Sequence, residues 1–494
     1  MAIAENTLNL LAFDLGGSGG KLMEGRFDGS RIGLSELIKF DNRPVPINRG
    51  LYWDIEGIYR FLLQGLRKAA AAGPVYSLGI DSFSNDFGLV DKNGELLTPV
   101  RCYRDDRTVR HADYVYSRVS KRKLYELTGN QNARFNTLMQ MGAMQAAGQG
   151  WILEHARRFL FVPDLLIYFL TGEALAEYTI ASVSQFFSFA SQNFCEELLA
   201  AFNLRRDLFG PVSMPGSPAG TIGGAPVQDQ GLPPCRVVSI CEHDTASAYL
   251  ASPLNSENTI IISSGTWSLM GCELKAPLIS EEGFHYNIAN EGGYPGHHRF
   301  LRNVMGSWII QEIRADYQAM GTEYSFADLE KAAEGAEPFV HFIDVDEDAF
   351  FSPGGIPEKI RKDCGKRGKI PESAGALTRC VYESLAMKYR RNLDILERVT
   401  GKTFETINIV GGGSRDGFLC RCTANACGRP VVAGPREATA LGNMLVQLIA
   451  AGKIASVEEG RNVIAASFPP VRYEPQEASR WEAEYRRYCA LFPE

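Results

Sequence analysis

The sequence has little of what marks a protein that binds nucleic acid or crosses a membrane. Its 494 residues carry a formal net charge of −7, from 51 Lys and Arg against 58 Asp and Glu, and no basic block stands out. A nucleic-acid or anionic-membrane partner usually leaves a footprint of Lys and Arg. The most apolar span, residues 159–170, is short and is interrupted by Pro163 and Asp164. It predicts the start of a buried helix, and we expect neither a nucleic-acid nor a membrane partner.

The cysteines lack the patterns of disulfide frameworks and metal sites. They number eleven, which is odd, and the first 17 residues have no basic segment of the kind that begins a secretory leader. We therefore expect reduced thiols and a cytoplasmic location. Cys420, Cys422 and Cys427 are close in sequence, but the chain has no C-x-x-C pair and no histidine after His341. We interpret the three as structural thiols.

What the chain does have is the length and composition of a globular protein with two large domains. It is 45% hydrophobic and 22% charged, without a low-complexity tract. Residues 9–27 and 258–274 share one design, an apolar strand, a small-residue turn and a second strand, which predicts two β-hairpins. We expect a boundary near residues 252–257, giving an N-terminal domain of residues 1–252 and a C-terminal domain of residues 253–494.

Helical patterns alternate with the predicted strands. Residues 54–73 combine helical apolar spacing with an acidic start and a glycine stop, and residues 373–401 and 437–452 form two further amphipathic segments. Strands are predicted at residues 77–83 and from residue 407. This alternation predicts an α/β fold.

Three glycine-containing loops follow apolar strands, at residues 16–21, 263–266 and 411–414. Glycine allows the backbone to approach a phosphate closely, and the alternative for each loop is an ordinary tight turn. The first loop is not a Walker A motif, because Leu15 and Leu22 stand where a glycine and a Ser or Thr are required. Leu22 also occupies the third glycine position of a dinucleotide fingerprint. The sequence thus supports neither a P-loop NTPase nor a Rossmann dehydrogenase.

Acidic residues stand at the ends of two predicted strands. Asp14 precedes the first glycine loop, where a carboxylate can hold hydrated Mg²⁺, and the matching position of the second hairpin is Ser264. The strand at residues 237–241 leads into Glu242, His243 and Asp244. By pattern alone, an Asp-Thr pair before a small-residue helix predicts a helix N-cap, and a lone histidine can be a structural one.

Several stretches together resemble the FGGY carbohydrate kinases, and among these the rhamnulokinase-like branch. They occur in the family's order and cover nearly the whole chain. The stretches are YRDDRT (103–108), HDTASAYLASP (243–253), SSGTWSLMG (263–271), NEGG with RNVMGSWIIQ (290–311), and GGGSRDGFL with GPREATALGN (411–443). The resemblance implies a two-domain actin-like ATPase (ribonuclease H-like) fold with a central cleft.

The resemblance also implies roles for residues at the matching positions. Asp244 is the expected general base for the sugar's C1 hydroxyl. Contacts to the sugar are expected from Ser84, His243, Thr245 and Asn303. Contacts to ATP are expected from Gly17, Ser18, Gly19, Gly20, Lys21, Thr266, Gln311 and Gly412. With Asp14 as the metal ligand, ATP and Mg²⁺ are the expected cofactors. Glu242 has no role that the resemblance supplies.

Two positions depart from the branch's pattern. Ser84 replaces a glycine that normally lies against the sugar, within the sequence Asp-Ser-Phe-Ser-Asn-Asp of residues 81–86. Lys21 stands where Arg is more usual, which keeps the charge but loses bidentate phosphate geometry. Trp53 and Phe83 are hypothesised to line an apolar pocket for the methyl group of a 6-deoxyketose.

The function expected from this resemblance is ATP-dependent phosphorylation of the C1 hydroxyl of a ketose. L-rhamnulose is favoured, with L-fuculose, L-ribulose and D-xylulose behind it. Two other classes are a non-catalytic kinase-like sugar sensor, which would need neither Asp14 nor Asp244, and a chaperone-like ATPase, which would need an additional peptide-binding domain. The sequence does not indicate the oligomeric state.

Overall fold

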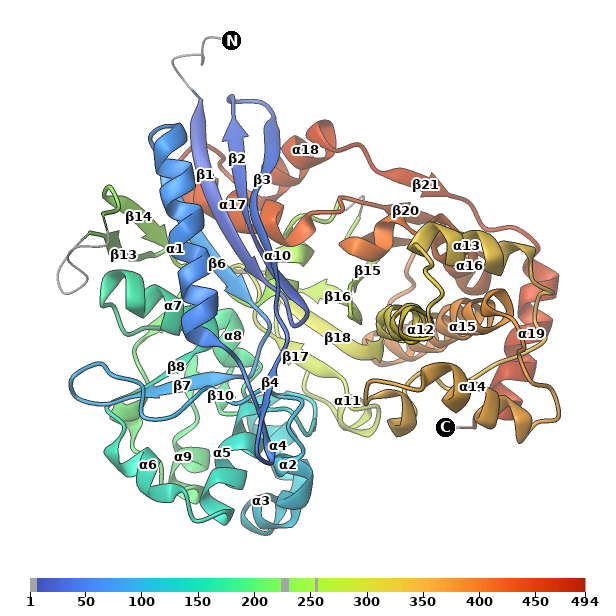
Figure 1. The fold of residues 1–494 in the computed structure, drawn as a ribbon, viewed down its shortest axis with the longest axis horizontal. Coiled ribbons are helices and arrows are strands. Elements are labelled where there is room, and N and C mark those ends of the chain that lie inside the picture. Colours follow the sequence, from blue (N-terminus) through green and yellow to red (C-terminus); the bar gives the residue numbers. More distant parts are fainter. Residues whose placement is uncertain (1–6, 224–230, 254–255, 494) are drawn as a thin grey trace. The chain divides into compact units, whose positions relative to one another are not determined.

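The computed structural model describes residues 7–223, 231–253 and 256–493, which form two compact units (Figure 1). The first unit comprises Met1–Ala251, Glu273–Phe300 and Ala438–Ser467, and the second comprises Ser252–Cys272, Leu301–Glu437 and Phe468–Glu494. Both units are therefore discontinuous in sequence. The division into domains at residues 252 and 253 stays a prediction, and residues 254 and 255 of the expected boundary lie outside the described residues.

A mixed six-stranded sheet forms the centre of the first unit, in the order β13-β14-β6-β1-β2-β3. Its strands are β1 (Leu8–Leu15), β2 (Gly19–Phe27), β3 (Ile32–Asp41), β6 (Ser77–Ser82), β13 (Pro218–Ile222) and β14 (Cys235–Val238). The predicted first hairpin is confirmed, because β1 pairs with β2 antiparallel from Leu8 with Phe27 to Leu15 with Gly20. The strands β14, β6 and β1 are parallel neighbours, so their carboxyl ends meet at one edge.

Helices cover both faces of this sheet. The helices α1 (Ile55–Ala72) and α7 (Val162–Thr171) share a buried apolar core with Leu78 and Ile80 of β6, and α10 (Asp244–Leu250) and α17 (Ala438–Ala450) also pack against β6. Gly79, which points the opposite way from its neighbours in β6, faces α17. The predicted helix at residues 54–73 is confirmed with its caps: the Asp54 side chain accepts a hydrogen bond from the Gly57 N–H, and Gly73 ends the helix.

The rest of the first unit is largely helical and has its own phenylalanine-rich core. Its elements are β4 (Val45–Ile47), β5 (Gly50–Tyr52), β7 (Phe87–Val90), α2 (Arg107–Arg110), α3 (Ala112–Arg118), α4 (Lys121–Thr128), α5 (Thr137–Ala146), α6 (Gly150–His155), β8 (Arg158–Phe161), β9 (Ala176–Glu177), α8 (Tyr178–Ser182), β10 (Phe187–Ser188), β11 (Asn193–Phe194), α9 (Glu196–Ala201), β12 (Val212–Ser213), α11 (Glu281–His285), β17 (Ala289–Glu291) and α18 (Val457–Ser467).

The apolar span 159–170 is only partly the helix that its sequence predicts. Residues up to Phe161 form β8, which pairs with β7, and α7 begins at Val162. The prediction was wrong for the first residues because a cross-strand partner far away in sequence outweighs local pattern. Pro163 lies in the first turn of α7, where its missing N–H costs no hydrogen bond.

The second unit contains most of a seven-stranded sheet with the order β17-β18-β16-β15-β19-β20-β21. The strands of this sheet, apart from β17, and the helices of the unit are β15 (Thr259–Ser264), β16 (Trp267–Leu274), β18 (His298–Met305), α12 (Trp308–Ala319), α13 (Phe326–Gly335), α14 (Ile356–Gly365), α15 (Ala374–Thr400), β19 (Thr406–Val410), α16 (Gly417–Cys427), β20 (Val431–Ala433), β21 (Val471–Tyr473) and α19 (Ala478–Leu491). The predicted hairpin at residues 258–274 and the helices predicted at 373–401 and 437–452 are confirmed. The α/β fold class is likewise confirmed.

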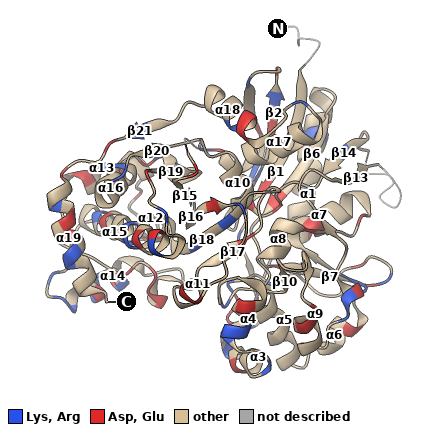
Figure 2. Cartoon of the chain, turned by 180° about the vertical axis from the view of Figure 1, so that it is seen from behind, with Lys and Arg blue, Asp and Glu red and all other residues tan. Residues whose placement is uncertain are grey.

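The cysteine thiols and the charged side chains have ordinary arrangements. All eleven cysteines are free thiols, and Cys420, Cys422 and Cys427 are buried, where burial raises the pKa of each thiol. Both signs of charge are interspersed along α13, α15 and α19 (Figure 2). Among the described residues, no helix combines the length and the apolar character needed to span a bilayer.

Candidate functional site

Three aspartates lie at the carboxyl-terminal edge of the parallel strands in the first unit. Asp14 of β1 is in register with Asp81 of β6, and Ser82 of β6 forms a bridge with His243, which precedes Asp244. Asp81 is fully buried, and its pKa is raised well above the ordinary value, first by burial and then by the nearby charges of Asp14 and Asp244. The three aspartates are therefore close enough to interact electrostatically.

Asp244 is the first residue of α10 and is held by its neighbours. Its Oδ1 accepts hydrogen bonds from the Thr245 N–H (2.5 Å) and hydroxyl (3.1 Å), and the His243 Nε2 lies 3.4 Å away. His243 is the N-cap residue, so the N-cap reading of Asp244 is not what the structure shows. The Asp244 side chain remains 30% exposed, while burial raises its pKa. Because part of the Asp244 carboxylate is exposed, it can accept a proton from a bound ligand.

His243 is fixed by an ion pair that the sequence did not reveal. Arg299 Nη1 lies 2.8 Å from Glu291 Oε2, and Arg299 Nη2 lies 3.1 Å from His243 Nδ1, with all three residues buried. The Glu291 Oε2 also lies 3.5 Å from His243 Nδ1, and the other ring nitrogen, Nε2, faces Asp244. Glu291 belongs to the NEGG stretch, which carried no assigned role. Arg299 had no sequence signal, because only the fold brings it to the histidine.

The first glycine loop is tightly built. The Gly16 N–H donates to the Gly19 carbonyl at 2.8 Å, and a Cβ at Gly20 would lie 2.3 Å from the Phe40 ring. Lys21 Nζ lies 3.2 Å from Asp14 Oδ2. Close packing therefore requires glycine at position 20, and the predicted metal ligand faces an ammonium group. Among the described residues no group of three or more His, Cys, Asp or Glu has the arrangement of a metal site.

The segment that departs from the family pattern is rigidly anchored. Asn85 has a positive φ of 75° and its side chain donates to the Ser84 hydroxyl at 3.0 Å. Asp86 is buried and accepts from the Trp53 indole (2.6 Å), the Tyr103 N–H (2.8 Å) and a glutamine of α5. Burial raises the pKa of Asp86 to about 7. Ser84 is thus presented from a fixed turn.

Trp53 and Phe83 pack against each other, with ring centroids 4.6 Å apart. Both side chains are buried, at 3% and 6% exposure. The structure therefore brings together the two rings of the hypothesised methyl pocket, and their contact with a sugar stays a prediction.

Three of the predicted nucleotide contacts, Thr266, Gln311 and Gly412, lie in the second unit, whereas those of the first glycine loop lie in the first unit. Thr266 follows β15, and its carbonyl accepts from the N–H groups of Gly306 (3.2 Å) and Trp308 (3.3 Å). Gln311 of α12 donates from Nε2 to the Ser307 hydroxyl at 3.0 Å, and Ser307 donates to the Gly265 carbonyl at 2.6 Å. Hydrogen bonds thus connect the turn that carries Thr266 to Gln311 of α12.

Gly412 lies in a loop at the end of β19, beside the end of β15. Gly411 has a φ of 84°, and a Cβ at Gly413 would lie 2.0 Å from the Ser264 Oγ. That hydroxyl is buried and has no hydrogen-bond partner among the described residues. A buried, unsatisfied hydroxyl beside a glycine loop matches the donor groups that cradle phosphates.

Asn303 of β18 also belongs to the second unit, whereas the other predicted sugar contacts belong to the first. Its side-chain Oδ1 is buried without a hydrogen-bond partner among the described residues. Such an atom is a candidate acceptor for a ligand hydroxyl.

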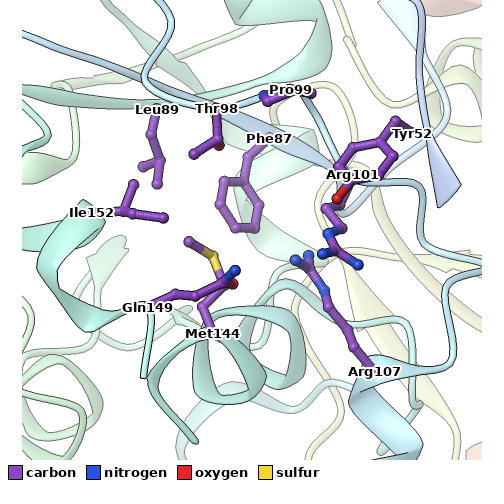
Figure 3. Close-up of a pocket in the computed structure, with 10 residues that line it drawn as sticks. All are labelled: Tyr52, Phe87, Leu89, Thr98, Pro99, Arg101, Arg107, Met144, Gln149 and Ile152. Carbon is purple, nitrogen blue, oxygen red and sulfur yellow. The ribbon is translucent and has the colours of Figure 1, made fainter. Parts of the chain in front are cut away.

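The first unit also holds a cavity of about 130 Å³ (Figure 3). Figure 3 shows the guanidinium groups of Arg101 and Arg107 turned toward each other at one end, with Leu89 and Ile152 at the other. Arg107 donates to Gln140 Oε1 at 2.8 Å, and burial, with the charge of Arg101, lowers its pKa to about 10. The cavity thus lies beside the hydrogen-bond chain that anchors Asp86, and its ten labelled residues include none of the predicted site residues.

Comparison with known proteins shows the family. The models of the N-terminal and C-terminal domains of the FGGY family of carbohydrate kinases match residues 10–251 and 260–451. A rhamnulokinase of Bacteroides thetaiotaomicron is 38% identical over 479 residues, covering 97% of this chain and 98% of that protein. A rhamnulokinase of Bacillus subtilis is 36% identical over 471 residues, covering 95% and 96%.

Solved structures show the same fold at low identity. A gluconate kinase from Lactobacillus acidophilus matches with a TM-score of 0.81 at 15% identity, covering 98% of both chains. A xylulose kinase from the same organism matches with a TM-score of 0.80 at 15% identity, covering 98% of this chain and 97% of that one. The actin-like ATPase fold implied by the resemblance is confirmed. The protein belongs to the FGGY family of carbohydrate kinases.

Proposed function

We propose that the protein is an ATP-dependent ketose kinase that phosphorylates the C1 hydroxyl of L-rhamnulose, with Asp244 as the general base. The observation that carries this proposal is the position of Asp244 at the strand edge, partly exposed and oriented by His243 and Thr245. The names of the full-length relatives support L-rhamnulose as the sugar.

In the proposed reaction, Asp244 accepts the proton of the C1 hydroxyl as the oxygen bonds to the γ-phosphorus. The bond between the γ-phosphorus and the bridging oxygen of ADP breaks. General-base help of this kind contributes about 10²–10⁴ in rate. His243 Nε2, 3.4 Å from Asp244 Oδ1, helps to orient the carboxylate toward the sugar.

The remaining assignments follow the resemblance to the family. Sugar contacts are proposed for Ser84, His243, Thr245 and Asn303, and nucleotide contacts for Gly17, Ser18, Gly19, Gly20, Lys21, Thr266, Gln311 and Gly412. Backbone N–H groups and hydroxyls at these positions can hold phosphate oxygens, and Lys21 adds a positive charge.

The donor set at Asp14 fits a hydrated Mg²⁺, which takes one or two carboxylates and keeps several waters. Asp14 would hold the ion, which would supply positive charge to neutralise the transferring phosphoryl group. The Lys21 ammonium, 3.2 Å from Asp14, adds a second positive charge at the same place.

The test is ADP release from Mg-ATP with L-rhamnulose, L-fuculose, L-ribulose, D-xylulose and glycerol. We expect L-rhamnulose to be preferred, and Asp244→Asn to lower kcat by about 10²–10⁴-fold. Asp207→Asn, a change at a surface carboxylate in the same unit, is the matched control and leaves kcat unchanged. Full activity of Asp244→Asn would contradict the role of Asp244 as general base. Preference for another ketose would contradict L-rhamnulose as the substrate but not the kinase activity.

A further inference from the structure

The cavity of the first unit has, at its polar end, a buried arginine without a counter-ion of its own. Arg107 is 8% exposed, and its guanidinium faces that of Arg101 in the cavity (Figure 3). Its side chain donates to the neutral amide of Gln140, and no carboxylate of the described residues forms an ion pair with it. A buried cation that lacks a paired anion is costly, so this end of the cavity is suited to an anion.

The nearby carboxylate of Asp105 is engaged by Arg101 and by the backbone. Asp105 Oδ2 accepts from Arg101 Nη1 and from the Leu51 N–H, and Oδ1 accepts from the Arg107 backbone N–H, all at 2.9 Å. Burial and the charge of Arg101 lower the pKa of Arg107 to about 10, so Arg107 stays protonated at neutral pH. Asp86 is only partly ionised there, because burial raises its pKa to about 7. The polar end therefore carries an excess of positive charge.

Gln140 fixes the direction in which the Arg107 guanidinium points. Gln140 Oε1 accepts from Arg107 Nη2 at 2.8 Å. Gln140 Nε2 donates to Asp86 Oδ1 (2.7 Å) and to the carbonyl groups of Asn85 (3.3 Å) and Phe135 (3.1 Å). Because these three acceptors hold the amide nitrogen, the amide oxygen must face Arg107. The guanidinium is therefore ordered before a ligand arrives, which lowers the cost of binding one.

The other end of the cavity is apolar. Leu89 and Ile152 lie there in Figure 3, and Phe87 and Met144 also line the cavity, with exposures between 1% and 7%. Pro99, on the same lining, is an exposed residue, which gives a ligand a way in from the surface. The volume of about 130 Å³ is close to that of a protein cavity that binds benzene, about 150 Å³.

We propose that this cavity is a binding site for a small organic carboxylate with a compact apolar body of about the size of benzoate. The carboxylate accepts hydrogen bonds from Arg101 and Arg107, whose planar forks match its two oxygens. The apolar body fills the end at Leu89 and Ile152. The inference does not depend on the sugar or on Asp244, because none of the predicted site residues lines the cavity.

Water and inorganic phosphate each satisfy only part of this cavity. Water can bond to the arginines, but it does not offset the charge of Arg107, and the apolar end offers it no partners. Phosphate offsets the charge and leaves the apolar end unfilled. A carboxylate joined to an apolar body satisfies both ends, as ligands of mostly apolar pockets with a few fixed polar groups do.

The first measurement is calorimetric titration of the full chain at neutral pH, without sugar or nucleotide, with three probes. Benzoate has the charge and the apolar body, benzamide has the shape without the charge, and inorganic phosphate has the charge without the body. We expect a Kd of about 0.1–1 mM for benzoate and binding at least about tenfold weaker for the other two. Benzamide as tight as benzoate overturns the role of the arginines, and phosphate as tight as benzoate overturns the apolar body. No binding of benzoate at about 10 mM overturns the site itself.

The second measurement repeats the benzoate titration with substituted proteins. Arg107→Gln removes a charged donor and should weaken binding by at least about tenfold. Arg110→Gln in the same helix, α2, is the matched control and leaves the Kd unchanged, because Arg110 is exposed and ion-paired with Asp106.

Ile152→Phe provides a variant that leaves both arginines in place. The larger ring fills the apolar end, so benzoate should again bind at least about tenfold more weakly. This variant keeps the test valid if Arg107→Gln fails to fold, which thermal unfolding of each protein would show. An unchanged benzoate affinity in either variant that folds overturns the proposed site.

Discussion

The two hairpins that begin the central sheets have the same local design and end in different chemistry. In the first unit, Asp14 is the next-to-last residue of β1 and lies beside Asp81 of the parallel strand β6. In the second unit, β15 ends at Ser264 beside the parallel strand β19 and its Gly411 loop. One strand edge gathers carboxylates, and the other gathers a hydroxyl and glycines.

This difference separates two tasks that a kinase must perform. Carboxylates can accept a proton or hold a cation, but they repel phosphate. Neutral hydroxyls and backbone N–H groups can hold phosphate without accepting a proton. The same arrangement of a hairpin and a parallel strand can therefore serve different functions, which depend on the two or three residues at the strand ends.

The largest effect is expected from making the first hairpin end like the second. Asp14→Ser removes the carboxylate proposed for Mg²⁺ together with its ion pair to Lys21. We expect kcat to fall by about 10²-fold, the usual cost of losing one electrostatic stabiliser of the transition state. The Mg²⁺ concentration for half-maximal activity should rise as well.

Steady-state kinetics with Mg²⁺ titration measures both quantities. Glu36→Ser, at an exposed position of β3, serves as the control and leaves both values unchanged. If the Mg²⁺ dependence of Asp14→Ser equals that of wild type, Asp14 does not hold the ion.

An intermediate effect is expected from overfilling the second hairpin's end. Gly413→Ala places a Cβ 2.0 Å from the Ser264 hydroxyl, so the loop must shift. Overpacking of this kind costs about 1–3 kcal/mol, and we expect the KM for ATP to rise about tenfold with little change in the KM for the sugar.

The double variant Ser264→Gly/Gly413→Ala removes the clash and should recover most of the loss in a double-mutant cycle. Additive effects of the two substitutions would mean that the loop's packing on Ser264 does not govern nucleotide binding.

The smallest effect concerns one acid with a raised pKa in each unit, Asp86 and Asp416. Burial raises the pKa of Asp86 to about 7 and that of Asp416 to about 6. An acid with a raised folded-state pKa loses stabilising free energy as pH rises from its unfolded value, about 3.9, to its folded value. Wild-type stability should therefore decline between pH 4 and 7 through Asp86, and between pH 4 and 6 through Asp416.

Urea unfolding at a series of pH values measures these slopes. Asp86→Asn should remove its part of the decline in unfolding free energy between pH 4 and 7, and Asp416→Asn its part between pH 4 and 6. Each variant's loss of stability relative to wild type should therefore shrink toward higher pH. A deficit that grows with pH in either variant would show that the carboxyl group is ionised in the folded protein at low pH.

Local sequence predicts much of this fold because local signals are strong where caps and turns are complete. The helix at residues 54–73 could be predicted from Asp54 and Gly73, and the position of Asp14 near a strand end from an apolar run that stops abruptly. The strand predicted at residues 237–241 was wrong in its bounds, because β14 already ends at Val238 and a loop leads to Asp244. Family resemblance then singled out Asp244 from the alternative of a simple cap.

Other features depend on contacts that no local pattern encodes. Residues 158–161 form a strand because β7 pairs with them, and Arg299 reaches His243 only after the chain has folded. The buried contact of Glu242 was hidden for the same reason, since its N–H donates to Glu177, which lies 65 positions earlier in the sequence.

The packing of α17 has a consequence for the order in which the chain is assembled. Asn443 of α17 donates to Asp81 Oδ2 at 2.6 Å, and Gln447 donates to Asn443 and to the Leu11 carbonyl while accepting from Ser77. The strand edge made by the first 82 residues therefore stays incomplete on the ribosome until residue 450 has emerged. A nascent chain carries the acids of its active edge long before it carries the amides that hold them.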